Sequence, residues 1–134
     1  MSKFILTMTL FLSLQTMVLA VEKTNSASTQ KVKVIELEKF DPEKQVTSLV
    51  GYNLRARKII VPAGVSIGEH AHDTRPGIVY VESGEIIEYR GDSSRLLKAG
   101  DSLVEDATTV HGYKNISNKN CVLIAFDLPK TGKK

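Results

Sequence analysis

Apolar side chains along most of this chain recur at every second position, which is the spacing of a β-strand. The alternation begins after Lys31 and continues through segments such as 54–61, where Leu54 and Ala56 lead into Ile59 to Val61. Turn-forming residues interrupt the alternation about every 8 to 12 residues, and no window of about ten residues beyond the first thirty has a helical stripe. Strands this short and this regularly spaced predict an all-β sandwich or barrel.

Two of the interruptions have the sequence of a β-hairpin. Gly84 separates the strand-like segments 78–81 and 85–89, and Gly91 lies in a second reversal. Glycine takes the positive φ that tight reversals need. We therefore expect hairpins at Gly84 and Gly91, and a third reversal at Gly100.

The chain has the size of one globular domain, preceded by a segment of different composition. Lys3, an apolar run over 4–14 and the small residue Ala20 form the pattern of a signal peptide. The run falls short of the roughly 20 apolar residues that span a bilayer. We expect a signal peptide at 1–20, a flexible leader and N-terminal arm at 21–38, a β-barrel at 39–128 and a basic tail at 129–134.

These features predict a periplasmic or secreted protein, cleaved near Ala20, without stable membrane insertion after the signal is removed. The net charge of +3 is small, and basic residues alternate with acidic ones, so we expect no nucleic-acid partner. Cys121 is the only cysteine, which excludes a disulfide within the chain. It lies in an apolar strand-like run, and we expect a buried, inert thiol.

The three histidines of the chain are the strongest functional signal. His70 and His72 are two apart, so on a strand both imidazoles point to one face. His111 lies in another predicted strand, 108–116, and converges with them if the two strands face each other across a barrel. Imidazole is a ligand for several divalent metals. We therefore predict a metal site formed by His70, His72 and His111.

The segments around these histidines resemble the two sequence motifs of the cupin family. Gly64, His70, His72 and Gly84 have the spacing of the first motif, and Gly100, His111 and Asn115 that of the second. Three positions depart from the motifs: Gly77 stands where the first has a glutamate, Asp106 where the second has a proline, and Thr108 where it has a glycine. The resemblance covers residues 64–115.

The resemblance implies a single-domain cupin fold, the double-stranded β-helix or jelly-roll barrel, and a homodimer is common in the family. It also implies one divalent transition metal on the three histidines, as in three-histidine dioxygenases. Fe2+ is favoured, with Zn2+, Cu2+, Mn2+ and Ni2+ as alternatives. Glu69 or Glu105 could replace the missing glutamate, although strand alternation points Glu69 away from His70.

Alternation also predicts which side chains surround the metal site. Tyr113 is two beyond His111 and should share its inward face, either bonding a substrate oxygen or filling the barrel. Val79 and Val81 should form an apolar wall. Arg75 lies in the loop between the motif strands, where it could meet an anion or remain solvated.

Three functions fit these features. The first is a metal-dependent oxidoreductase, resembling the dioxygenases, that acts on a small organic molecule. The second is a periplasmic module that binds a metal or small ligand without turnover. The third is a metal-dependent isomerase or lyase, for which Tyr113 is the only inward titratable group that the sequence places near the histidines.

Overall fold

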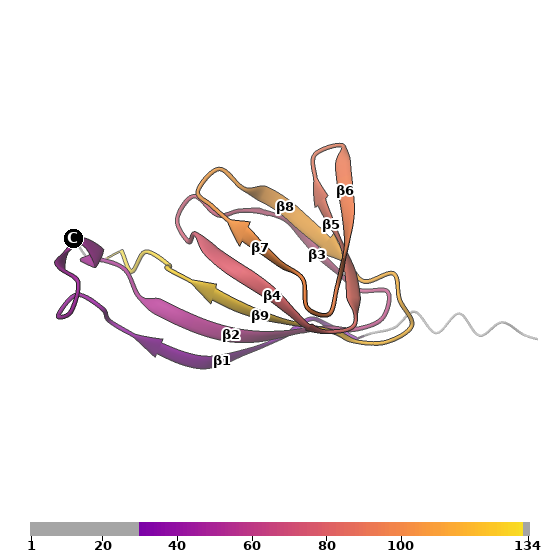
Figure 1. Ribbon diagram of the computed structural model, residues 1–134, viewed down its shortest axis with the longest axis horizontal. Coiled ribbons are helices and arrows are strands. Elements are labelled where there is room, and N and C mark those ends of the chain that lie inside the picture. The colour runs from indigo at the N-terminus through magenta and orange to yellow at the C-terminus, as the bar shows by residue number, and fades with distance from the viewer. Residues whose placement is uncertain (1–29, 133–134) are drawn as a thin grey trace, which may run out of the picture.

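The computed structural model describes residues 30–132, which form nine strands and one short 3-10 helix (Figure 1). The predicted signal peptide lies outside the described residues. In chain order the elements are β1 (Lys33–Phe40), the 3-10 helix η1 (Thr47–Leu49), β2 (Leu54–Val61), β3 (Ser66–Ala71), β4 (Gly77–Ser83), β5 (Glu85–Arg90), β6 (Ser93–Lys98), β7 (Ser102–Glu105), β8 (Val110–Lys114) and β9 (Cys121–Asp127).

The strands form two antiparallel sheets that pack against each other. One sheet has the order β1-β2-β9-β4-β7 and the other the order β3-β8-β5-β6. Figure 1 shows the smaller sheet lying over one part of the larger, with β1 and β2 extending beyond it. The predicted all-β, single-domain architecture is confirmed. No helix among residues 30–132 is long and apolar enough to cross a membrane.

The hairpin predicted at Gly84 is wrong, whereas the one at Gly91 is confirmed. β5 and β6 pair directly from Glu85↔Lys98 to Arg90↔Ser93, around Gly91. β4 and β5 instead belong to different sheets. Gly84 has a φ of 79°, and a Cβ there would lie 2.6 Å from the carbonyl oxygen of Asn120. Its positive φ therefore turns the chain from one sheet into the other, as does the reversal at Gly100 between β6 and β7.

Both ends of the described chain attach to the barrel. Within the segment predicted as leader and arm, β1 pairs antiparallel with β2 of the same chain, for example through Val34↔Ile59. At the other end, Lys130 forms an isolated bridge with Tyr52. Because β1 is the first strand in the order of the larger sheet and pairs with β2, it is an edge strand of that sheet.

The core consists of the inward positions of both sheets. Val79 and Val81 are at most 1% exposed, which confirms their predicted orientation, and β5 contributes the buried Ile86. Cys121 is also fully buried, and burial together with the nearby Glu85 raises the pKa of its thiol to about 11. The predicted inert thiol agrees with this environment.

Candidate metal centre

The three histidines come from one corner of the smaller sheet. β3 and β8 are hydrogen-bonded neighbours in which His70 pairs directly with His111. His72 follows β3, and its backbone N–H donates to the carbonyl of Thr109 at 3.0 Å. The expected convergence is confirmed, but not its cause, because the two strands are adjacent rather than opposed across the barrel.

The imidazole rings surround a single point. One ring nitrogen from each histidine lies within 4.8 Å of those of the other two, and Nε2 of His72 is 3.1 Å from Nε2 of His111. Two metal–nitrogen bonds of about 2.0–2.1 Å that meet near a right angle separate their nitrogens by about 3 Å. The spacing of His72 and His111 therefore suits two neighbouring ligands of one ion.

The hydrogen bonds on the far side of each ring fix which nitrogen faces this point. Each Nδ1 lies beside an oxygen atom: the carbonyl of Gly68 for His70 (2.9 Å), the carbonyl of Arg75 for His72 (3.2 Å) and Oε1 of Glu88 for His111 (2.7 Å). Because these oxygens only accept, each Nδ1 carries the proton and each neutral ring presents the lone pair of Nε2. Lone pairs 3.1 Å apart repel unless a proton on His111 or a metal ion lies between them, so the neutral donor set fits a metal ion.

Glu88 on β5 is a functional residue that the sequence analysis missed. Its side chain is 1% exposed and accepts hydrogen bonds from His111, Arg90 and Arg95. Burial alone would raise the pKa of this carboxyl, but these three donors outweigh it and lower the pKa. Glu88 therefore remains an ionised acceptor that orients His111. Its position two residues after the buried Ile86 is the sequence signal that could have identified it.

Glu105 is the acidic side chain beside Nε2 of His111, on the side of the rings that faces the shared point, whereas Glu69 is exposed. Oε1 of Glu105 lies 3.4 Å from Nε2 of His111, and Oε2 lies 3.5 Å from Nδ1 of His72. Glu105 pairs across β4 and β7 with Gly77. A Cβ at Gly77 would clash with the carbonyl oxygen of Phe126. The carboxylate beside the histidines therefore comes from the strand next to the one that carries Gly77.

Tyr113 lies on the inward face, as its spacing from His111 predicted. It is 3% exposed, and its hydroxyl donates to Oε1 of Glu105 at 3.0 Å. Burial, and then the charge of Glu105, raise the pKa of Tyr113 far above its ordinary range. Tyr113 is therefore a hydrogen-bond donor and not a base. Asn115 is also inward, but its amide donates to the backbone carbonyls of Val61 and Lys119 and so supports the barrel.

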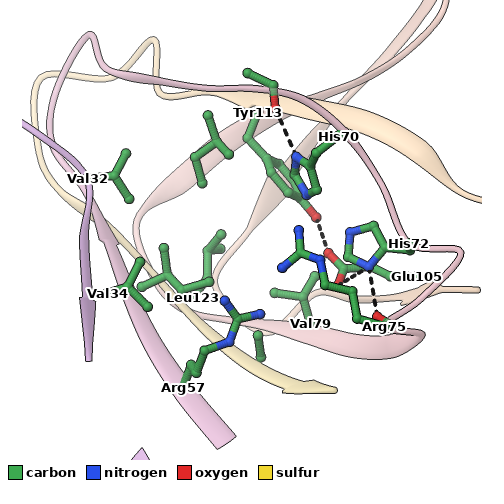
Figure 2. A pocket seen from close by; sticks show the side chains of 14 residues that line it. Val32, Val34, Arg57, His70, His72, Arg75, Val79, Glu105, Tyr113 and Leu123 are labelled. Carbon is green, nitrogen blue, oxygen red and sulfur yellow. Dashed lines mark hydrogen bonds and ion pairs between the residues drawn. The ribbon is translucent and has the colours of Figure 1, made fainter. Parts of the chain in front are cut away.

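A cavity of about 280 Å3 opens beside the histidines (Figure 2). His70, His72, Tyr113 and Glu105 form its polar side. The apolar walls consist of Val32, Val34, Ile59, Ile67, Val79, Leu123 and Ala125. Of the two valines predicted to form an apolar wall, Val79 lines this cavity, whereas Val81 is buried in the core and is not among the lining residues.

Two arginines, Arg57 and Arg75, also line the cavity. Alternation of apolar residues had drawn attention to Leu54 and Ala56 on β2, but Leu54 is 38% exposed. Arg57 lies on the inward face of β2 instead. Its charge is accommodated there because Nη2 of Arg57 donates to the buried Asp127 at 2.7 Å. Sequence reasoning missed Arg57 because it followed apolar residues alone.

Asp127 joins β9 to β2 through two arginines. Arg55 donates to it twice, from Nε at 3.0 Å and from Nη2 at 2.8 Å, beside the single bond from Arg57. Nε of Arg57 is buried, with no hydrogen-bond partner among the described residues. A buried donor left unpaired costs about 1–3 kcal/mol, so the Asp127 network satisfies Arg57 only in part.

Binding of Zn2+ to the metal-free protein is expected to release more protons near pH 6.5 than at about pH 8.5. Burial lowers the pKa values of His70 and His72 below 6.5, so these rings are mostly neutral at pH 6.5. Burial also opposes protonation of His111, but hydrogen bonds to Glu105 and Glu88 raise its pKa above 6.5. Below this raised pKa, His111 carries an additional proton that the metal must displace. Above it, His111 is neutral and metal binding releases no proton from this ring. Calorimetric titration in two buffers of different ionisation enthalpy measures the release, and a pH-independent count would contradict the assignment.

Comparison with known proteins supports the fold and the family. The family model described as "Cupin domain" matches residues 57–127. No curated protein matches the chain significantly.

Several solved structures have a similar fold. An uncharacterized protein with a double-stranded β-helix domain from Klebsiella pneumoniae has a TM-score of 0.63 at 19% identity, with 79% of this chain and 84% of that chain covered. A predicted oxalate decarboxylase from Thermotoga maritima has a TM-score of 0.59 at 22% identity, with 73% and 80% covered. The cupin domain of Schizosaccharomyces pombe Cnp3 has a TM-score of 0.62 at 17% identity, with 76% of this chain but only 63% of that chain covered.

At these identities the structural likeness concerns the fold alone. The matched segment contains both histidine-bearing regions and strands of both sheets, from Arg57 on β2 to Asp127 at the end of β9. The family model therefore matches more than half of the sequence, and the matched residues form most of the two-sheet barrel. This chain belongs to the cupin family.

Proposed function

We propose that this protein is an exported, metal-dependent oxidoreductase of the dioxygenase type that acts on a small organic molecule. The observation that carries the proposal is the common tautomer of the three imidazoles, each with Nδ1 bonded to an oxygen and Nε2 directed to the shared point. Three neutral nitrogens suit a divalent transition metal, of which Fe2+ is favoured, with Zn2+, Cu2+, Mn2+ and Ni2+ as alternatives.

The residues of the candidate metal centre have different roles at such a site. A bound ferrous ion would supply redox chemistry toward oxygen. His70, His72 and His111 would hold it, and Glu88 keeps His111 in the required tautomer. Tyr113 holds the Glu105 carboxylate beside Nε2 of His111. The apolar walls of the cavity exclude water from the substrate.

One observation supports a second candidate, a metal-dependent isomerase or lyase. Such an enzyme needs a base beside the metal, and Glu105 lies at that position. Burial would raise the pKa of Glu105, but the neighbouring His111 and His72 and the hydrogen bond from Tyr113 lower it. A carboxylate with a lowered pKa is a weak base, which favours the oxidoreductase over the isomerase or lyase.

Metal analysis with oxygen-uptake measurements tests the proposal. We expect about one iron per chain after anaerobic loading with Fe2+, and oxygen uptake that depends on one member of a panel of small organic acids. Zn2+-loaded protein is the control and should consume no oxygen. Protein that stays metal-free with its histidines intact would overturn the proposal. Anaerobic turnover by the Zn2+ or Mn2+ form would favour the isomerase or lyase.

Export and assembly are further parts of the proposal. Export rests on the charge and apolar pattern of residues 1–20, and the mature protein should begin directly after Ala20. Mass spectrometry of the periplasmic fraction measures this. The homodimer expected from the family resemblance stays a prediction, which sedimentation equilibrium would test.

A further inference from the structure

We propose that the cavity binds a small aliphatic carboxylic acid, with its carboxylate held by Arg75 and Arg57 and its hydrocarbon part against the apolar walls. The proposal deepens the function proposed above, because it names the substrate class of the same site.

The guanidinium of Arg75 has no hydrogen-bond or ion-pair partner among residues 30–132. The loop that carries it is fixed instead through its backbone, because the N–H of Arg75 donates to the carbonyl of His72 and its carbonyl accepts from Nδ1 of His72. Figure 2 shows the Arg75 side chain directed into the cavity, between Arg57 and the Tyr113–Glu105 pair. A half-buried guanidinium that is well placed and unpaired is suited to a carboxylate.

Arg57 adds a second set of donors from a different wall. Asp127 engages Nη2 of Arg57, and the other guanidinium nitrogens have no hydrogen-bond partner among the described residues. The charge of Arg75 also acts on Arg57, whose pKa is lowered first by burial and then, against the effect of Asp127, by Arg55 and Arg75. Two cations that face the same enclosed space repel each other, so an anion bound between them is stabilised by both.

The charges around the cavity also favour an anion. Among the lining residues Arg57 and Arg75 provide two positive charges, against the one negative charge of Glu105, while Asp127, outside the lining, is shared by Arg55 and Arg57. A divalent ion on the histidines would increase this excess. A ligand with one carboxylate supplies the missing negative charge.

The remaining walls define the rest of the ligand. The volume of about 280 Å3 is slightly below the roughly 300–1,000 Å3 range of ligand pockets, which favours a small ligand. Seven valine, isoleucine, leucine and alanine side chains form the surface opposite the polar groups. A short, branched aliphatic chain fits these walls, whereas inorganic phosphate would leave them in contact with water.

Calorimetric titration with isovalerate and its neutral isostere isovaleramide tests the proposal. Both probes have the same branched chain and differ in the carboxylate. We expect wild-type protein to bind isovalerate at least about tenfold more tightly than isovaleramide or inorganic phosphate. Arg75→Met keeps the length of the side chain and removes its charge, and should reduce isovalerate affinity about tenfold or more while leaving isovaleramide affinity unchanged.

Lys58→Met is the matched control. Lys58 lies next to Arg57 on β2 and points to the opposite face, where it pairs with Glu82 at 2.9 Å. This variant loses the same charge and should retain wild-type affinity for isovalerate. Equal wild-type affinity for acid and amide, no binding of isovalerate, tighter binding of phosphate, or unchanged affinity in Arg75→Met would each overturn the proposal.

The same titrations separate this proposal from the metal-dependent function. They are performed on metal-free and on Zn2+-loaded protein, with metal content measured independently. Metal binding without selective carboxylate binding would overturn the carboxylate site and leave the oxidoreductase proposal standing. Arg75-dependent binding of isovalerate by protein that takes up no metal would support the carboxylate site and overturn the metal-dependent function.

Discussion

His72→Ala is expected to abolish metal retention while the barrel remains folded. His72 provides one of three converging nitrogens, and its Nε2 lies 3.1 Å from that of His111. Loss of a residue that merely orients a ligand reduces metal affinity about 10- to 100-fold, so loss of a ligand should reduce it at least about 100-fold. Competition with a chromophoric chelator for Zn2+ measures the affinity, and circular dichroism of the metal-free protein measures folding.

Cys121→Ala is the control for this experiment. Cys121 is the only thiol of the chain and is fully buried on β9. Because burial raises the pKa of this thiol to about 11, it is not expected to bind metal, and the variant should retain wild-type affinity. If His72→Ala retained metal, or if Cys121→Ala lost it, the three imidazoles would not be the binding site. Unfolding of metal-free His72→Ala would show that the imidazole has a structural role.

Asp127→Asn is expected to lower the free energy of unfolding by about 2–4 kcal/mol. The buried carboxylate accepts hydrogen bonds from Arg55 and Arg57, and the isosteric amide leaves both guanidinium groups without their counter-charge. Removing one partner of a buried ion pair is costly, because the remaining charge stays away from water. Urea denaturation of the metal-free protein measures the change without a contribution from metal binding.

Glu82→Gln makes the same chemical change in an exposed ion pair. The side chains of Lys58 and Glu82 are 34% and 43% exposed, so loss of their attraction should cost less than about 1 kcal/mol. Equal losses in Glu82→Gln and Asp127→Asn would mean that burial does not strengthen the Asp127 network. The variant Asp127→Asn should also bind isovalerate more weakly, since Asp127 positions Arg57.

The sequence allowed the fold class to be predicted because the strand period is local information. Alternation identified the inward Val79, Val81 and Tyr113, and the two-residue spacing of His70 and His72 placed both rings on one face. Sheet membership could not be predicted in the same way. Gly84 has the residue type of a hairpin turn, yet the partner of each flanking strand is set by contacts with distant segments.

The polar half of the site was harder to predict because its residues violate the apolar pattern. Glu88 points inward and accepts hydrogen bonds from His111, Arg90 and Arg95. Asp127 accepts hydrogen bonds from the inward Arg57 and from Arg55. A charged residue at an inward position resembles a break in the alternation until its partner is known. The adjacency of His70 and His111 likewise depends on the register of β3 and β8, which residue spacing does not specify.

The position of Glu105 affects how a metal site of this kind can be recognised from a sequence. A Cβ at Gly77, which stands where the motif that the sequence resembles has a glutamate, would clash with the backbone of Phe126, while the cross-strand neighbour of Gly77 places a carboxylate beside His111. A search that counts residues along the chain scores this protein as lacking an acid. A search that compares atoms in three dimensions finds one. In this chain the acid beside the three histidines follows from the pairing of β4 with β7 and not from the spacing of residues along the sequence.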